Sequence, residues 1–163
     1  KIIRNPIILK IIFKIGGIKL IREITKDDKE IFIELEEKFY NSEAVIHPVP
    51  KDYIIRTFKE VISDSPYAKA YIIESDSNVA GYSQISLTYS SEVGGLVVLI
   101  EELFILDDFR NKGLGSEFLE FIEKEFPEAK RFRLEVEKDN EGAKRLYETK
   151  GFKKLNYLQM VKE

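Results

Sequence analysis

The stretch that decides the fold is Arg110-Asn111-Lys112-Gly113-Leu114-Gly115, which follows an apolar run at residues 96–106. The run predicts a buried strand, and the periodic apolar residues after the turn predict a helix at residues 113–126, ended by Pro127. The first N–H groups of a helix lack internal partners, and the helix dipole adds positive charge there. Glycines let an anion approach this backbone closely. The turn therefore predicts an anion site, although two glycines also suit a plain tight connection.

Two widespread phosphate-binding motifs do not fit this turn. A Walker turn ends in Gly-Lys-Ser/Thr, whereas this one continues as Gly115-Ser116-Glu117. A dinucleotide-binding turn needs a third glycine, and Phe118 stands in its place. Neither nucleotide class is predicted from the turn itself.

Apolar periodicity and turn residues divide the rest of the chain into alternating helices and strands. The result is one α+β domain with a mixed sheet. The predicted strands are residues 18–24, 68–74, 79–89, 131–137 and 152–161, and the predicted helices are residues 28–40, 52–62 and 140–150, the last closed by Gly151.

Composition limits the functional classes. The chain has 163 residues, of which 44% are hydrophobic and 34% charged, which fits one globular domain. It has no cysteine, which excludes disulfides and thiolate metal sites and suits a cytoplasmic location. The formal charge of −3 without a basic run argues against nucleic-acid binding.

The N-terminal residues 1–17 are rich in isoleucine, but Lys10 and Lys14 interrupt the apolar run. The pattern predicts neither a signal peptide nor a spanning helix, and so no stable membrane insertion. We expect an extra strand, or an extension of unclear role before the main domain at residues 18–163.

Two motifs in register carry a family resemblance. The first is Arg110-x-x-Gly113-x-Gly115, and the second begins at Asn140, runs through Ala143 and Tyr147, and closes at Gly151-Phe152. With them, residues 18–161 resemble the GNAT family of N-acetyltransferases. The likeness implies a single domain with a mixed, mostly antiparallel sheet flanked by helices.

Residues 81–117 are also similar to spermidine/spermine N-acetyltransferases. Two positions depart from the usual pattern, with Asp107 in place of a proline and Asn111 in place of a glycine. Neither change removes a backbone donor that the turn needs.

The resemblance implies acetyl-CoA as co-substrate and no metal. It implies that the turn holds the pyrophosphate and that a bulged central strand binds the pantetheine arm through its backbone. For Asn140, a plain helix N-cap is an alternative role. The implied cofactor-binding residues are Leu103, Phe104, Ile105, Arg110, Asn111, Lys112, Gly113, Leu114, Gly115, Ser116, Asn140, Ala143 and Tyr147.

Three residues are candidates for the chemistry. An alkyl ammonium with a pKa near 10.4 must lose a proton before it attacks, which calls for a base. Glu101 and Glu102 interrupt the apolar central strand, and neighbouring strand residues usually point to opposite faces. The resemblance favours Glu101 as base, with Glu102 second, and Tyr147 as the acid for the leaving thiolate. Each also has a structural alternative, a surface carboxylate or a core aromatic.

The sequence thus predicts an enzyme that acetylates a primary amine of a small molecule, polyamine-like as a first guess. Acetylation of a protein N-terminus or lysine is an alternative, as is a non-catalytic acyl-CoA-binding module. Dimers are common in the family, so a homodimer is a possible partner.

Overall fold

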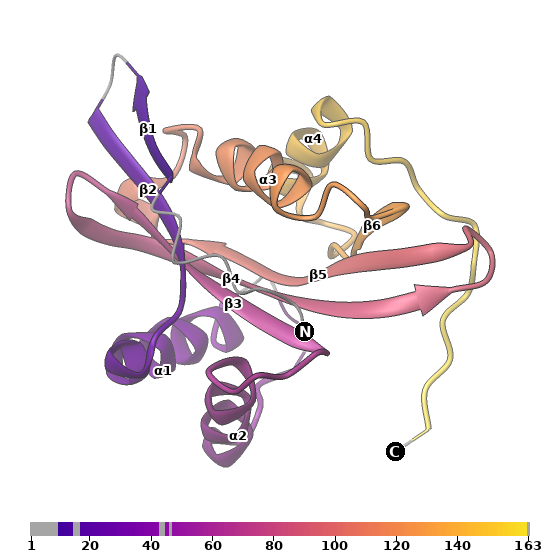
Figure 1. Cartoon of the computed structure of the whole chain (residues 1–163), viewed down its shortest axis with the longest axis horizontal. Helices are drawn as coiled ribbons and strands as arrows, with labels where there is room; N and C mark the ends of the chain where they lie inside the picture. Colours follow the sequence, from indigo (N-terminus) through magenta and orange to yellow (C-terminus); the bar gives the residue numbers. More distant parts are fainter. Residues whose placement is uncertain (1–9, 15–16, 43–44, 46, 163) are drawn as a thin grey trace.

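Six strands pair in chain order into one mixed sheet (Figure 1). A computed structural model describes residues 10–14, 17–42, 45 and 47–162. The strands from β1 to β5 are antiparallel, and β6 joins β5 in parallel. The elements are β1 (Lys10–Lys14), β2 (Gly17–Glu23), η1 (Lys26–Asp28), α1 (Lys29–Tyr40), α2 (Lys51–Val61), β3 (Ala68–Ser75), β4 (Asn78–Ser90), β5 (Gly95–Ile105), η2 (Asp107–Phe109), α3 (Leu114–Glu125), β6 (Arg131–Leu134) and α4 (Glu141–Thr149).

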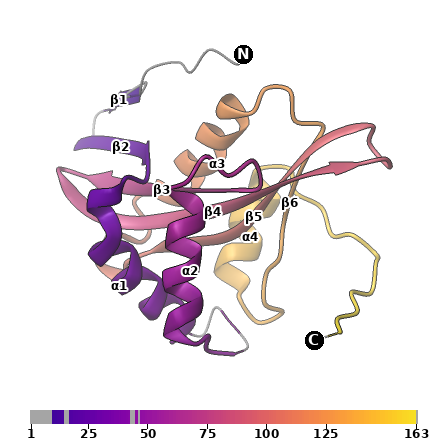
Figure 2. The same cartoon turned by 60° about the horizontal axis from the view of Figure 1, so that its bottom comes forward.

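Helices cover both faces of the sheet (Figures 1 and 2). On one face, α1 and α2 pack through Phe32, Leu35 and Phe58 against buried residues of β3 and β4. On the other face, α3 inserts Phe118 and Ile122, and α4 adds partly buried side chains. Each helix therefore buries one apolar stripe, as its 3.6-residue periodicity predicts.

The predicted α+β class is confirmed, and the helices and most strands fall where periodicity placed them. Residues 10–14 form an additional edge strand, whereas residues 1–9 lie outside the described part. Gly151 takes a left-handed conformation with φ of 83° after α4, as predicted.

The strand predicted at residues 152–161 is wrong, because the chain after α4 forms no ladder within the described residues. This tail passes the tip of the β4–β5 hairpin, where the Tyr157 hydroxyl donates to Glu92 at 3.3 Å (Figure 1). Strand-forming residue types suggested pairing, but the apolar residues here do not alternate, so no register buries one face. The large apolar side chains that this tail exposes are Leu155, Tyr157, Leu158, Met160 and Val161.

Strand β5 contains one extra residue relative to β4. Gln84 lies opposite Glu102, whereas the next residue, Ile85, lies opposite Ile100. Glu101 is therefore unpaired and forms a β-bulge, which bends the strand and interrupts its alternation.

The bulge exchanges the two faces of β5. Before it, Val98 and Ile100 pack on the α3 side of the sheet. After it, Leu103 packs on the α3 side and Phe104 on the α1 side. Glu102, two residues before Phe104, therefore also points towards α1.

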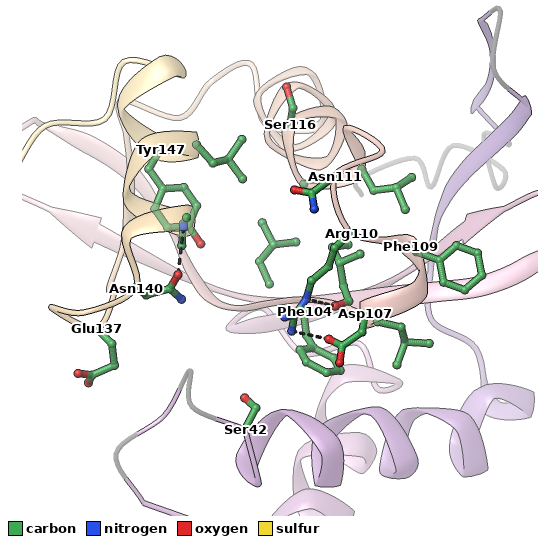
Figure 3. Close-up of a pocket in the computed structure, with 18 of the residues that line it drawn as sticks. Ser42, Phe104, Asp107, Phe109, Arg110, Asn111, Ser116, Glu137, Asn140 and Tyr147 are labelled. Atoms are coloured by element: carbon green, nitrogen blue, oxygen red, sulfur yellow. Dashed lines mark hydrogen bonds and ion pairs between the residues drawn. The ribbon is translucent and has the colours of Figure 1, made fainter.

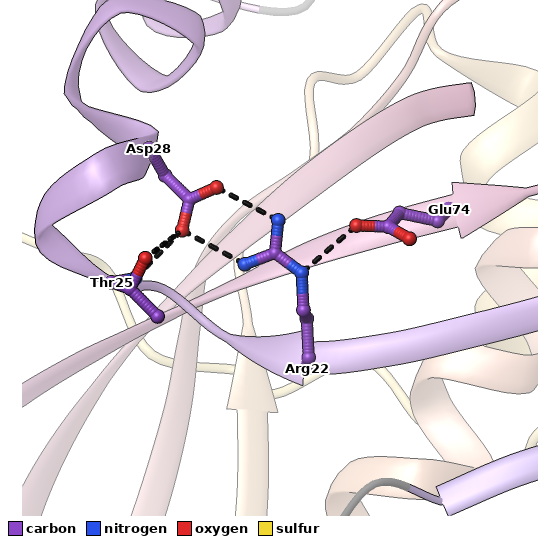
Figure 4. Close-up of polar contacts among 4 residues, drawn as sticks. All are labelled: Arg22, Thr25, Asp28 and Glu74. Atoms are coloured by element: carbon purple, nitrogen blue, oxygen red, sulfur yellow. Dashed lines mark hydrogen bonds and ion pairs between the residues drawn. The ribbon is translucent and has the colours of Figure 1, made fainter. Parts of the chain in front are cut away.

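An ion-pair cluster ties β2 to the start of α1 and to β3 (Figure 4). The Arg22 guanidinium donates to both carboxylate oxygens of Asp28, at 2.7 and 2.8 Å, and to Glu74 at 2.8 Å. Asp28 also accepts from the backbone N–H and the hydroxyl of Thr25, and Thr25 is the N-cap residue of η1. Hydrogen bonds from Arg22 lower the pKa of Asp28 from 3.8 to about 2. Burial acts in the opposite direction, but its effect is smaller.

We expect Asp28→Asn to lower the free energy of unfolding at pH 7 by about 2 kcal/mol. Because the folded pKa of Asp28 lies below the unfolded one, this stability is present above the unfolded value of 3.8 and disappears as pH falls towards 2. Urea denaturation between pH 7 and pH 2.5 measures it. Asp52→Asn, which breaks an exposed ion pair with Arg56, is the control and should cost less than about 1 kcal/mol. A pH-independent loss in Asp28→Asn would contradict this role.

Candidate active site

A cleft of about 1500 Å³ opens where β5 and β6 diverge (Figure 3). Among the residues that the structure describes, β5 pairs with β6 only from Val97 to Ile100, so the end of β5 has no strand partner on that side. The turn into α3, the segment leading into α4, and the C-terminal end of α1 form the other walls. Of the predicted cofactor-binding residues, the structure brings together along this cleft Leu103, Phe104, Ile105, Arg110, Asn111, Gly113, Leu114, Gly115, Ser116, Asn140, Ala143 and Tyr147.

The turn before α3 directs backbone donors into the cleft. Gly113 is the N-cap residue, with φ of 81°, and Asn111 is also left-handed, with φ of 60°. The first bond of the helix runs from the Glu117 N–H to the Gly113 carbonyl, so the preceding N–H groups lack helical partners. A Cβ on Gly115 would lie 3.0 Å from Cδ2 of Leu146, so this glycine permits close packing of α3 on α4. The helix end is therefore open to an anion.

The basic side chains of the turn make local contacts. Arg110 donates from Nε to the Ile105 carbonyl at 3.2 Å and pairs with Asp107 at 3.0 Å. The Nζ atom of Lys112 lies 5.0 Å from the centre of the Phe109 ring, and Lys112 does not line the cleft. The backbone of the turn, rather than these side chains, supplies the aligned donors.

The end of β5 presents unpaired backbone to the same cleft. Leu103 to Ile105 remain hydrogen-bonded to β4, but beyond Ile100 no strand of the described chain pairs with the side of β5 towards β6. An extended ligand can pair with these groups as an added strand.

The two candidate carboxylates, Glu101 and Glu102, do not line the cleft. Glu101 is exposed and accepts a hydrogen bond from Ser86 at 2.6 Å. Glu102 is buried and accepts from the hydroxyls of Tyr40 and Tyr82, both at 2.6 Å. Because of the bulge both carboxylates lie on the α1 and α2 side of the sheet, so the expectation that they would face opposite sides is wrong.

Burial raises the pKa of Glu102, although the two tyrosine hydroxyls oppose this shift. Burial, followed by the charge of Glu102, raises the pKa of Glu36 from 4.5 to about 9. Glu36 was not predicted as a site residue. The sequence does contain an indication of burial, because Glu36 falls on the apolar stripe of α1 between Phe32 and Phe39.

Tyr147 projects from α4 into the cleft (Figure 3). Its ring packs against Phe152 at 6.0 Å between centroids, and burial raises the pKa of its hydroxyl. It therefore remains protonated at neutral pH and able to donate. Asn140 caps α4 by accepting from the Ala143 N–H at 3.0 Å, so its alternative role as a helix cap is present.

This chain is similar to known acetyltransferases in sequence and in fold. The sequence model described as the acetyltransferase (GNAT) family matches residues 26–152. A possible acetyltransferase from Clostridium difficile 630 has a TM-score of 0.74 and 20% identity, over 89% of this chain and 97% of that chain. Aminoglycoside N-acetyltransferase AAC(6')-Iy, solved in complex with CoA, has a TM-score of 0.74 and 16% identity, over 93% of this chain and 99% of that one.

A ribosomal-protein-alanine N-acetyltransferase from Brucella melitensis biovar Abortus 2308 has a TM-score of 0.71 and 16% identity, covering 89% of this chain and 98% of that chain. None of the curated proteins matches this chain at a significant level. Within the described ranges, no helix is both long and apolar enough to cross a membrane.

We expect Gly113→Ala to lower the free energy of unfolding by about 1–2 kcal/mol, because an L-residue is disfavoured at its φ of 81°. Gly142→Ala is the matched control. It lies in the first turn of α4, where an added methyl meets only Asn140 Oδ1 at 3.9 Å, and alanine favours a helix. Urea denaturation of the two variants compares them, and equal stability would contradict a strained turn before α3.

Proposed function

Because the chain belongs to the acetyltransferase (GNAT) family, we propose that it transfers an acetyl group from acetyl-CoA to a primary amine of a small molecule. One observation carries the proposal. The open N-terminus of α3 and the unpaired end of β5 border the same cleft, one suited to an anion and the other to an extended amide-containing chain. Coenzyme A has both parts, a pyrophosphate and a pantetheine arm.

In this proposal the backbone from Asn111 to Ser116 binds the pyrophosphate, and Leu103, Phe104 and Ile105 bind the pantetheine arm. A β5 N–H group then polarises the thioester carbonyl. Arg110 and Lys112 add positive charge around the turn. Asn140 and Ala143 hold the start of α4, and so the position of Tyr147, beside the cofactor.

The reaction needs a base and an acid. The neutral amine attacks the thioester carbon, the C–S bond breaks, and the sulfur takes a proton from Tyr147. The nitrogen then loses its second proton to water, and water returns a proton to Tyr147. A carboxylate at the bulge, Glu101 or Glu102, accepts a proton from the ammonium before attack. Burial raises the pKa of Glu102, which makes its carboxylate a stronger proton acceptor than an ordinary one.

The charge of the cleft supports a cationic acceptor. Two basic residues, Lys38 and Arg110, line it together with more numerous acidic ones. A bisubstrate analogue, CoA-S-monomethyl-acetylneamine, is bound in one structure of AAC(6')-Iy, which has 16% identity to this chain and supports a small polar amine as acceptor. The polyamine-like acceptor, the homodimer and the cytoplasmic location stay predictions. The acidic lining residues are Asp107, Asp108, Glu137, Asp139 and Glu141.

The direct test is thiol release from acetyl-CoA with a panel of spermidine, kanamycin, lysine and a peptide with a free N-terminus. We expect release above background with a small amine and weaker release with the peptide. Preference for the peptide would move the function to protein acetylation. Absence of release with every acceptor would overturn the enzymatic proposal and leave a binding module.

We expect acetyl-CoA to raise the melting temperature by several degrees. At about 100 times its Kd, a ligand that binds only the native state adds about 2.7 kcal/mol to the free energy of unfolding. Differential scanning fluorimetry measures the shift. Pantetheine, which lacks the pyrophosphate, should give a smaller shift, and an equal shift would contradict a phosphate site at α3.

We expect Tyr147→Phe to lower kcat by about 10²-fold or more and to leave the Kd for acetyl-CoA within a few-fold, because only the proton donor is lost. Steady-state kinetics and calorimetric titration separate these effects. Tyr157→Phe, at an exposed position in the C-terminal tail, is the matched control. Unchanged turnover in Tyr147→Phe would remove it as the acid.

A further inference from the structure

Two carboxyl groups lie buried together between α1 and β5. Glu36 is 1% exposed and Glu102 is 6% exposed. Three cations of α1 and α2 pair with other carboxylates, Lys38 with Glu34, Lys51 with Glu37 and Arg56 with Asp52. Within the described part of the chain, no ion pair reaches either buried carboxyl. An unpaired buried charge is costly, so the presence of two carboxyls here calls for a functional explanation.

The hydrogen bonds distinguish the two carboxyls. Each oxygen of Glu102 accepts from a tyrosine, Oε1 from Tyr40 and Oε2 from Tyr82. This is the arrangement of an ionised carboxylate. By contrast, Oε1 of Glu36 is buried without a partner, and so is Oε1 of Gln84, which lies opposite Glu102 on the same face. A proton on Glu36 turns one unpaired acceptor into a donor.

The groups that surround Glu36 and Glu102 favour one proton on this pair of carboxyls. α1 contributes Glu36 and Tyr40, β4 contributes Tyr82, and β5 contributes Glu101 beside Glu102, so the ionisable groups are all acidic. Burial and like charge prevent both carboxyls from ionising together, and they raise the pKa of Glu36 to about 9. Glu36 is therefore the protonated member of the pair at neutral pH, while the two tyrosine donors favour the charged form of Glu102. The buried side chains of α2, Ile54, Phe58 and Val61, are apolar.

Tyr40 lies next in sequence to residues that border the cleft. The tyrosine is partly exposed, and the residues that follow it, Asn41 and Ser42, line the cleft. On the β5 side, Glu102 directly precedes the lining residues Leu103 and Phe104. Tyr40 itself does not line the cleft, but residues adjacent in sequence to both partners of the Tyr40–Glu102 hydrogen bond do.

We propose that Tyr40 and Glu102 form a proton relay that deprotonates the acceptor ammonium, with Glu36 holding the pair at one negative charge. The Tyr40 oxygen takes a proton from the ammonium while the Tyr40 hydroxyl proton passes to Glu102. An N–H bond breaks, an O–H bond forms on Glu102, and Tyr40 ends unchanged. Glu102 later releases the proton to water. Tyr40 is the catalytic residue that meets the substrate, and Glu36 is a positioning residue. The relay rests on the proposed acetyltransferase function.

The relay is tested with Tyr40→Phe and the acceptor that the wild-type protein acetylates fastest in the panel of spermidine, kanamycin, lysine and peptide. We expect kcat/KM at pH 7 to fall by about 10²–10⁴-fold. The loss should shrink as pH approaches about 10.4, where the amine deprotonates without help. Tyr53→Phe, on the exposed side of α2, is the control and should match the wild type. A loss that is equal at every pH would reveal a structural role and overturn the relay.

The shared proton is tested without turnover, by the melting temperatures of wild type and Glu36→Gln from pH 5 to pH 9. The folded pKa of Glu36 lies above its unfolded value of 4.5, so the wild type loses stability as pH rises towards 9, whereas glutamine does not titrate. We expect Glu36→Gln to melt close to the wild type at pH 5 and increasingly above it towards pH 9. A pH-independent difference would overturn the shared proton.

The acetyltransferase function and the proton relay are distinguished by separate outcomes. If no panel acceptor releases thiol with the wild-type protein, the proposed function fails and the relay with it. If the wild type acetylates an amine and Tyr40→Phe keeps full activity at pH 7, only the relay fails.

Discussion

A single extra residue in β5 determines where the chemistry of this protein can take place. Glu101 is not paired with any residue of β4, so the strand bends and its two faces exchange beyond this point. Glu102 then faces α1, and Leu103 faces α3. β5 and β6 are paired for only four positions, up to Ile100 and Leu134, and the cleft opens beyond them. Without the bulge, Glu102 would share the apolar α3 face with Ile100.

The two sides of the cleft contribute different chemistry. Towards α3, the donors are backbone groups, fixed by a left-handed Gly113 and by the unpaired end of β5, and they need no side-chain charge. Towards α1, the groups are side chains held in an apolar setting, with Glu102 bonded to Tyr40 and Tyr82. A low-dielectric surrounding strengthens such hydrogen bonds and makes any unmet polar group expensive. The acidic pair therefore costs stability, and its retention is consistent with a role in handling protons.

Periodicity alone predicted most of this fold, because the helices and strands each bury one regular face. The turn from Arg110 to Gly115 was also predicted from the sequence, since glycines between a strand and a helix let an anion approach the backbone N–H groups. The bulge in the central strand was predicted from the family resemblance rather than from local pattern, and the register of β4 with β5 confirms it. Glu101 and Glu102 were expected on opposite faces, and only the register with β4 reveals that one of them is an insertion.

Other misses have similar causes. Residues 152–161 contain strand-forming residue types but lack strict alternation and have no ladder partner, so local propensity gave the wrong answer. Glu36 was visible as a carboxylate on an apolar helix stripe, whereas its neighbours Tyr82 and Glu102 come from distant strands. Such a cluster depends on tertiary contacts that a sequence pattern does not contain.

The most direct test of the cleft is a titration of the ¹⁵N-labelled protein with coenzyme A, followed through the backbone amide resonances. The proposed geometry predicts the largest changes at the N–H groups of Leu114, Gly115 and Ser116, with a second set at Leu103 to Ile105 at the end of β5. Changes that leave both sets unperturbed, or the absence of any change at millimolar coenzyme A, would contradict a cofactor site between α3 and β5.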